Sequence, residues 1–160
     1  MRFPRYLFAG ENNGSYPKLT SISFGSEITN IDNYAFAYCI YISSITIPSQ
    51  VTSIGIGAFE GCAGLTEINF NATNCSVVVS KGAIFYGSGV NTDGITLTFG
   101  DNVKSVPARA FTACKIKEIN FGSGVEIINE YAFTECTVLS EVVIPKNIKL
   151  ITNLKLYSFM

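Results

Sequence analysis

The residues of this chain that could do chemistry are its acidic side chains and its five cysteines, because the sequence contains no histidine. The absence of histidine excludes Ser-His-Asp and Cys-His catalysis and His-ligated zinc or haem. Paired carboxylates remain, and such pairs can hydrolyse glycosides. Glu67, Glu118 and Asp101 are the candidates for general acid and base. Nothing in the sequence places two of them around a pocket, so we expect no catalytic residue and no cofactor.

The cysteines are spaced too widely for a metal site. They occupy positions 39, 62, 75, 114 and 136, whereas zinc sites pair cysteines about two to four residues apart. Their odd number does not suggest a disulfide framework. We expect Cys39, Cys62, Cys114 and Cys136 to be small buried side chains, although a disulfide between stacked neighbours is sterically possible. Cys75 stands outside this pattern and is predicted to be the most exposed thiol.

One glycine-rich segment has a superficial likeness to a phosphate-binding loop. It runs from Gly55 through Gly57 to Gly61 but lacks the Lys-Ser/Thr pair that ends such a loop. The segment also stands in register with residues 32–35 and 129–132, which occupy the same place before or at an Ala-Phe pair. The repeat described below therefore explains these glycines, and we expect no phosphate site there.

The composition predicts one folded domain without a strongly charged partner. The chain has 160 residues, of which 48% are hydrophobic and 14% charged, and this balance argues against disorder. A net charge of −1 offers no footprint for nucleic acid or for an anionic membrane. No apolar run approaches the roughly 18 residues of a membrane span. The apolar stretch within residues 1–10 is too short for a secretory signal, which leaves open a cytoplasmic protein or a piece of a longer one.

A repeat dominates the chain. Four copies of Ala-Phe-x-x-Cys end at Cys39, Cys62, Cys114 and Cys136, at intervals of 23, 52 and 22 residues. The long interval leaves room for one degenerate copy with six extra residues. Each copy follows an apolar pattern of the form Leu-x-x-Ile-x-Ile and then Gly or Pro, as at residues 19–25 and 42–48. Pairs of Val or Ile three residues apart lie between the two patterns.

This pattern fits neither an amphipathic helix nor a hairpin sheet, because one unit turns twice within about 23 residues. We interpret each unit as one turn of a coil. A short strand buries alternate side chains, Gly or Pro turns the chain, a second extended piece holds the Val/Ile pair, and Ala-Phe-x-x-Cys forms a 3₁₀ or helical corner. Apolar residues fill nearly all inward positions, and the exceptions are Ser76, Gly87, Gly94 and Lys155. Stacked units bury together what no unit can bury alone.

The unit resembles the BspA-like class of leucine-rich repeat, whose pattern is Leu-x-x-Ile-x-Ile-Pro-x-x-Val-x-x-Ile-x-x-x-Ala-Phe-x-x-Cys. Residues 42–62 match it almost letter for letter, and the match extends from about Leu19 to Ile151. The resemblance implies a right-handed parallel solenoid with a main sheet and a second row of short strands. It further implies a protein-binding surface used in adhesion by host-associated bacteria and protists, with extracellular-matrix proteins among the ligands.

Three parts of the chain depart from the repeat. Residues 1–18 lie outside the register and are expected to form an N-terminal cap or the remnant of a preceding repeat, whereas residues 19–160 form a solenoid of about six units. The third unit is irregular, and we assign its extra residues to bulging loops at 71–76 and 87–93. Such loops can carry function or reflect tolerated drift. The sixth unit is degenerate, with Lys155 and Phe159 replacing Ala and Cys, and it ends in an apolar C-terminus.

The outward positions of the main strands form the candidate binding site. Alternation along each strand places two mostly polar side chains per unit on the outer face, and stacking joins them into one stripe. We call this set the strand-face stripe, and it comprises Ser21, Ser23, Ser44, Thr46, Glu67, Asn69, Thr96, Thr98, Glu118, Asn120 and Glu141. The stripe is either a ligand face for a basic or glycosylated partner or the soluble face of a sheet, in which Ser and Thr are common.

The repetition itself predicts a non-catalytic scaffold that binds a protein or glycoprotein ligand, because catalysis needs a unique constellation of residues in a cleft. The alternative is a structural spacer or assembly module that associates end to end through its apolar C-terminus. A carboxylate-based hydrolase is the third hypothesis. We expect no nucleic-acid partner and no membrane insertion. The resemblance implies an extracellular or cell-surface location, although residues 1–10 contain no visible signal peptide.

Overall fold

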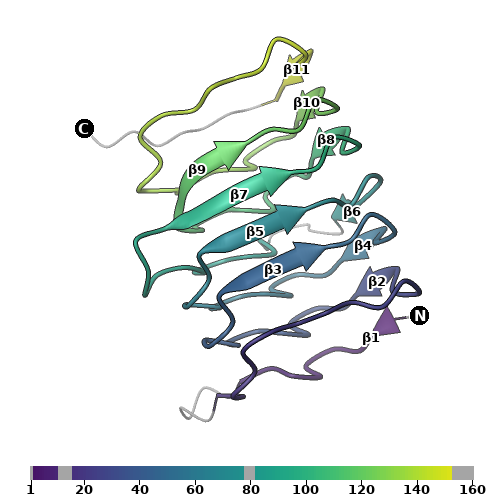
Figure 1. The fold of residues 1–160 in the computed structure, drawn as a ribbon, viewed down its shortest axis with the longest axis vertical. Coiled ribbons are helices and arrows are strands. Elements are labelled where there is room, and N and C mark those ends of the chain that lie inside the picture. Colours follow the sequence, from purple (N-terminus) through teal and green to yellow (C-terminus); the bar gives the residue numbers. More distant parts are fainter. Residues whose placement is uncertain (1, 11–15, 78–81, 153–160) are drawn as a thin grey trace.

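Short parallel strands stacked at regular intervals build the molecule. The computed structural model describes residues 2–10, 16–77 and 82–152. Its main sheet contains, in this order, β3 (Ser44–Ile47), β5 (Glu67–Phe70), β7 (Ile95–Phe99) and β9 (Ile116–Asn120). All three pairings are parallel and join strands one coil apart. Figure 1 shows this sheet beside a second row of much shorter strands.

The second row consists of two-residue strands. Its first sheet contains β1 (Arg2–Phe3), β2 (Asn30–Ile31), β4 (Ser53–Ile54) and β6 (Ser76–Val77). Its second sheet contains β8 (Ser105–Val106), β10 (Ile127–Ile128) and β11 (Leu150–Ile151). All pairs are parallel. The result is a parallel-strand solenoid of about five turns, which confirms the predicted fold.

Alternating burial explains why these segments form strands. In β3, Ile45 and Ile47 are buried whereas Ser44 and Thr46 are exposed. The register places Ile45 beside Ile68 of β5 and continues through Leu97 of β7. β-branched and other apolar side chains therefore stack into a continuous inward file, as strand propensity and the burial of apolar area both favour.

A column of phenylalanine rings runs through the core, as the repeat predicts. Phe36, Phe59, Phe85, Phe111 and Phe133 stack with ring centroids 5.4, 5.0, 5.5 and 5.7 Å apart along the column. All five are buried. Each stacked pair contributes about 0.5–1.5 kcal/mol beyond the burial of its area. The column is therefore the element that locks successive coils into one register.

The predicted 3₁₀ or helical corner is wrong for the described residues, none of which is helical. The Ala-Phe-x-x-Cys segments instead form turns with two left-handed residues each. In the second coil these are Tyr34 and Tyr38, with φ of 56° and 58°. The backbone N–H of Phe36 donates to Ala58 O of the next coil at 2.8 Å. Hydrogen bonds between coils thus add to the bonds that each turn makes within its own coil, such as that from the Ala37 N–H to Tyr34 O at 3.2 Å.

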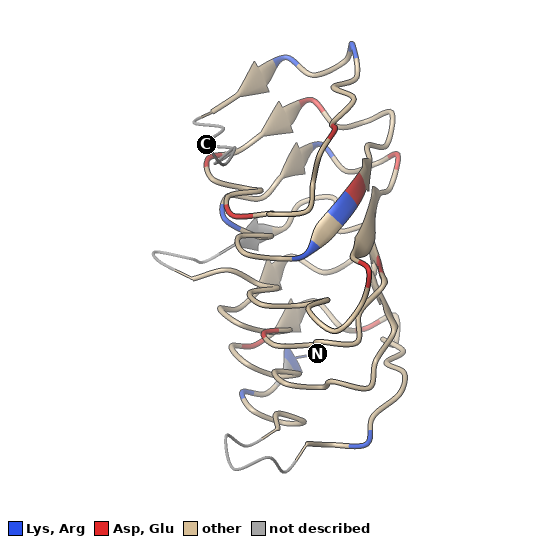
Figure 2. Ribbon diagram, turned by 90° about the vertical axis from the view of Figure 1, so that its left-hand side faces the viewer, with Lys and Arg blue, Asp and Glu red and all other residues tan. Residues whose placement is uncertain are grey.

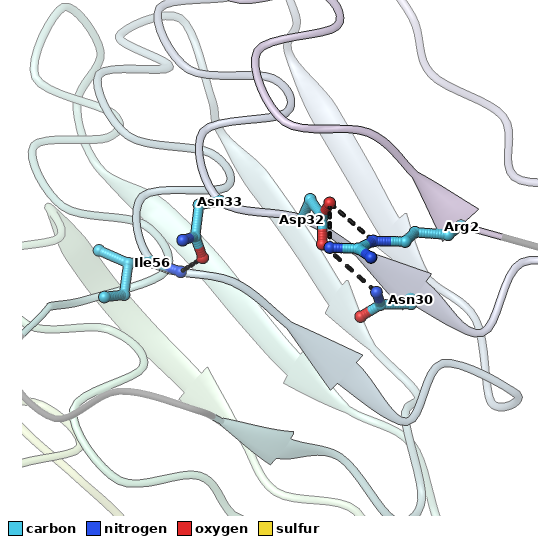
Figure 3. A network of polar contacts seen from close by, with 5 residues as sticks. All are labelled: Arg2, Asn30, Asp32, Asn33 and Ile56. Carbon is cyan, nitrogen blue, oxygen red and sulfur yellow. Dashed lines mark hydrogen bonds and ion pairs between the residues drawn. The ribbon is translucent and has the colours of Figure 1, made fainter.

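Side chains add further bonds between coils beside the second row. The Asn33 side chain accepts a hydrogen bond from the backbone N–H of Ile56, 2.9 Å away in the next coil. Arg2 forms an ion pair of 2.7 Å with Asp32, to which Asn30 also donates at 3.3 Å. Figure 3 shows Arg2 and Asn30 converging on Asp32, with Asn33 directed at Ile56. These contacts hold the corner residues of neighbouring coils in register.

The third unit corrects the alignment that the sequence suggested. β6 pairs Val77 with Ile54, so residues 71–76 form no bulging loop: the N–H of Asn71 donates to Ile47 O, and Ala72 is buried. Phe85 and Ser88, not Ile84 and Gly87, occupy the Phe and Cys positions. The repeat pattern misplaces this motif by one residue, because Ala83-Ile84 resembles the Ala-Phe pair of the other units.

The extra residues at 87–93 are attached to the coil before them and do not bulge freely. The N–H of Gly89 donates to Cys62 O, and that of Asn91 donates to Ala63 O. Ile95 follows them, is buried, and fills the inward position that was assigned to Gly94. A β-bulge between β7 and β9 absorbs this shift.

The first described residues continue the stacking of the coils. β1 pairs with β2, and the Phe8 ring stacks on Phe36 at 5.6 Å. Tyr6 stacks on Tyr34 at 5.3 Å with the same left-handed backbone. Residues 2–10 thus occupy the positions of half a coil. The apolar terminus at 154–160 lies outside the described residues.

The thiols of Cys39, Cys62 and Cys136 donate to carbonyl oxygens of the preceding coil. All five thiols are free. Cys39, Cys62 and Cys114 are buried, and Cys62 Sγ lies 3.3 Å from Phe36 O. Ser88 replaces cysteine in the third unit and donates to Phe59 O at 2.7 Å. Cys136, which the repeat predicts to be buried, is half-buried.

Thiol labelling is expected to be slow in the native state. Desolvation raises the pKa of Cys39 to about 11 and that of Cys75 and Cys136 to about 12, so little of the reactive thiolate forms near neutral pH. Mass spectrometry after maleimide treatment should find five adducts in denaturant and, without it, only slow modification of Cys75 and Cys136. A Cys75→Ser variant should lose one of these adducts, and rapid native labelling of three or more thiols would contradict the buried ladder.

Candidate functional site

The structure places eight residues of the strand-face stripe in two parallel rows on the main sheet. The residue pairs of the sheet define both rows. The first row is Ser44, Glu67, Thr96 and Glu118, and the second is Thr46, Asn69, Thr98 and Asn120. Each step crosses one strand spacing of about 4.8 Å. A rigid sheet therefore displays the side chains of four coils as one surface.

These side chains are exposed or half-buried and bond to one another. Asn69 donates its amide N–H to Glu67 at 2.6 Å, and Asn120 donates to Glu118 at 3.4 Å. The Thr96 hydroxyl donates to Glu118 at 3.3 Å. The carboxylates are therefore oriented along the sheet, with acceptor capacity left for a ligand.

The remaining members of the stripe lie beyond the ends of the sheet. Ser21, Ser23 and Glu141 are exposed, but their segments form no strand. The alternation of burial still continues there, since Ile22 and Val142 are more buried than their neighbours. Val143, two residues after Glu141, is 74% exposed and adds an apolar side chain to the C-terminal end of this outer surface.

Lys117 is a surface residue that the sequence pattern did not assign to the stripe. The β-bulge opposite Ile95 and Thr96 places it next to Glu118 with both side chains exposed. The signal for it was the shorter spacing in β7, where Ile95 stands two residues before Leu97 instead of three. Figure 2 shows blue and red positions scattered over the coils without a face of one sign. The surface thus has mixed charge.

The carboxylates proposed for a hydrolase are not arranged for one. Glu67 and Glu118 stand on the open sheet with the Thr96 strand between them. Asp101 lies just after the end of β7, in a depression that Asn71 and Asn102 also line. The described lining residues of this depression include no second carboxylate. Hydrogen bonds from the Ser123 N–H and hydroxyl, both 2.9 Å, lower the pKa of Asp101. A general acid needs the opposite shift.

Within residues 2–10, 16–77 and 82–152, no three Cys, Asp or Glu side chains are grouped to hold a metal ion. The same part of the chain has no helix with the length and apolar character needed to span a bilayer.

Sequence reasoning missed a second surface, formed by tyrosines at the corners. Tyr6 and Tyr86 are 53% and 50% exposed. Tyr34 and Tyr38 are half-buried beside them, and Glu60 lies between the two. These residues are scattered in the sequence, and only the stacking of coils brings them together. The available signal was Gly57 and Gly61, which stand one coil after Tyr34 and Tyr38.

Comparison with protein families identifies the repeat. The model of the BspA type leucine rich repeat region matches residues 12–89 and 83–159, with six copies. The chain belongs to the BspA-type leucine-rich repeat family. Membership in this family is consistent with a protein-interaction scaffold. A search of curated proteins gives no match.

Two solved structures share the solenoid fold of this BspA-type chain with TM-scores above 0.5, and a third is less similar. A leucine-rich repeat protein from Eubacterium ventriosum is 25% identical with a TM-score of 0.66, over 93% of this chain and 38% of its own. One from Bacteroides ovatus is 19% identical with a TM-score of 0.57, over 85% and 40%. A leucine rich cell surface protein from Faecalibacterium prausnitzii has 22% identity and a TM-score of 0.43, over 83% and 42%. The chain spans less than half the length of each.

Proposed function

We propose that this chain is a non-catalytic scaffold that binds a protein or glycoprotein ligand through the outer face of its main sheet, at the cell surface or outside the cell. The observation that carries this proposal is the pair of rows on β3, β5, β7 and β9, where four coils display exposed carboxylate, hydroxyl and amide groups in register. Solenoids bind through such extended surfaces. The apolar side chains of the same strands lie in the core or pack against it, so the polar side chains form the outer face.

The three glutamates of the strand-face stripe are expected to supply much of the ligand affinity. A triple variant with Glu67→Gln, Glu118→Gln and Glu141→Gln keeps the size of each side chain but removes its charge. We expect binding to immobilised extracellular-matrix proteins, measured by surface plasmon resonance, to weaken at least about 10-fold, because charge-assisted hydrogen bonds are worth about 1.5–3 kcal/mol each.

A matched control separates the position of the charges from net charge. The variant with Asp93→Asn, Glu130→Gln and Glu135→Gln changes the net charge equally at exposed residues outside the sheet. It should bind like the unmodified chain. Equal affinity of both triple variants and the unmodified chain would overturn the assignment of binding to the stripe.

A second candidate function is an assembly module, and the last described coil favours it. Ile144, Leu150 and Ile151 are 42, 50 and 38% exposed, which is a high apolar exposure for one coil of a solenoid. End-to-end association would cover these side chains. Light scattering would then show a mass that rises with protein concentration, whereas a constant monomer mass contradicts association.

A further inference from the structure

The tyrosine corner is built around glycines that let rings lie flat on the next coil. A Cβ at Gly57 would collide with the Tyr34 ring, and one at Gly61 would collide with the Tyr38 ring. Both glycines have left-handed backbone, with φ of 60° and 65°, which glycine adopts at no steric cost. The backbone of the next coil at Gly57 and Gly61 therefore packs directly against the Tyr34 and Tyr38 rings.

Glu60 lies at the centre of this corner. Its Oε1 accepts a hydrogen bond of 2.9 Å from the Tyr38 hydroxyl, which raises the pKa of Tyr38 and keeps the phenol protonated. Among the described residues, no donor bonds to its Oε2, which faces the space above Gly57. An oriented carboxylate oxygen with acceptor capacity thus stands between aromatic rings.

Three adjoining depressions meet at Glu60. One of about 440 Å³ is lined by Tyr34, Glu60, Tyr86 and Arg109 among others. A second of about 470 Å³ is lined by Tyr16, Tyr38, Glu60 and Tyr86 among others, and a third of about 370 Å³ shares Tyr34, Tyr38 and Glu60. All three depressions have Glu60 as a lining residue, and the first two also share Tyr86.

The first depression is bordered by coils whose corner residues differ in size. Neighbouring coils carry Tyr34 and Arg109 at the left-handed position before the Ala-Phe pair, whereas Gly57 holds that position in between. Gly82 and Ala83 line the same space in the third unit. The Arg109 guanidinium stacks over Tyr131 at 4.2 Å and is thereby held at the rim.

We propose that this corner, formed by Tyr34, Tyr38, Glu60, Tyr86 and Arg109, binds a neutral hexose unit of a glycan. A pyranose has an apolar C–H face that packs on an aromatic ring, and its hydroxyls both donate and accept. The tyrosine rings supply the platforms, Glu60 accepts hydrogen bonds from sugar hydroxyls, and the Arg109 guanidinium donates hydrogen bonds to them. The aromatic rings, the carboxylate and the guanidinium then each have a partner on the sugar.

Other ligands leave one of these groups unsatisfied. An apolar side chain would bury the Glu60 Oε2 atom without a hydrogen-bond donor, which is unfavourable. A cation would meet Arg109 in the same depression, and an anion would meet Glu60. One carboxylate and one guanidinium offset each other, so a neutral polyhydroxylated ring fits the charge as well as the shape.

The test is an NMR titration of the ¹⁵N-labelled full chain with the methyl glycosides of glucose, galactose and mannose and with trisaccharides of each. We expect saturable binding of at least one sugar, with shifts concentrated at Tyr34, Gly57, Glu60 and Tyr86. Glu60→Gln, which retains the side-chain size, and Tyr86→Ala, which changes an exposed residue, should each weaken binding roughly 10-fold.

Tyr41→Ala is the matched control, because Tyr41 is 53% exposed and lines none of the three depressions; it should bind sugar normally. The stripe variant Glu67→Gln, Glu118→Gln and Glu141→Gln should also bind normally, so this site and the main-sheet site fail independently. Absence of saturable binding to every sugar, unchanged binding in Tyr86→Ala, or the same shifts with an arginine- and tyrosine-containing peptide in place of sugar would each overturn the proposal.

Discussion

Phe111→Ala is expected to lower the free energy of unfolding by about 3–5 kcal/mol, the range for truncating a buried aromatic ring. Phe111 stacks between Phe85 and Phe133, and its ring also meets Phe70 and Phe99 edge to face at 6.0 and 5.8 Å. It joins the phenylalanine column to the rings of the main sheet. Removing it leaves a cavity that coils on both sides would have to fill. Urea denaturation measures the loss.

Two control variants test whether the loss is specific to the buried ring of Phe111. Phe111→Leu retains much of the volume and should cost clearly less than alanine. Tyr41→Ala truncates an aromatic residue that is 53% exposed and should stay within about 0.5 kcal/mol of the unmodified chain. A Phe111→Ala variant as stable as Tyr41→Ala would show that the column does not hold the coils together.

Gly122→Ala is expected to destabilise the solenoid by about 1–3 kcal/mol, as overpacking does. A Cβ at position 122 would stand 2.5 Å from Gly100 O and 2.6 Å from Phe99 O. Both atoms are backbone of the preceding coil, so neither can rotate away. The two coils would have to separate at the turn that follows each main strand. Thermal unfolding should show a lower Tm.

Gly25→Ala provides the control at the equivalent position of the repeat. No heavy atom lies within 4 Å of a Cβ built there. Its stability should therefore match that of the unmodified chain within about 0.5 kcal/mol. Equal destabilisation by both substitutions would mean that glycine is needed for the turn itself and not for the approach of coils.

The spacing of Ala-Phe-x-x-Cys was enough to predict the phenylalanine column, because a fixed interval in a stacked coil becomes a fixed position in space. The same logic placed Ser44, Glu67 and Thr96 in one row. It failed at Phe85, where an extra residue before the motif allowed Ala83-Ile84 to imitate the pattern. Inter-coil pairing, which the sequence does not display, decides between such neighbouring alignments.

The corner conformation could not be read from residue types. Left-handed backbone occurs at Tyr34, Tyr38, Ala113 and Glu135, none of which is glycine, so the usual signal is missing. Each coil accepts this local cost because its amides then bond to the next coil. The tyrosine corner follows from that geometry, since it depends on which rings lie over Gly57 and Gly61. The sequence shows these residues but does not show that they are in contact.

The central claim is that coils of about 23 residues stack with their phenylalanines in one column, and aromatic NOESY spectra test it most directly. With Phe selectively labelled, the account predicts ring-to-ring cross-peaks from Phe36 to Phe59 and from Phe111 to Phe133, whose centroids are 5.4 and 5.7 Å apart. Spectra in which these rings show cross-peaks only to residues close to them in the sequence would contradict it.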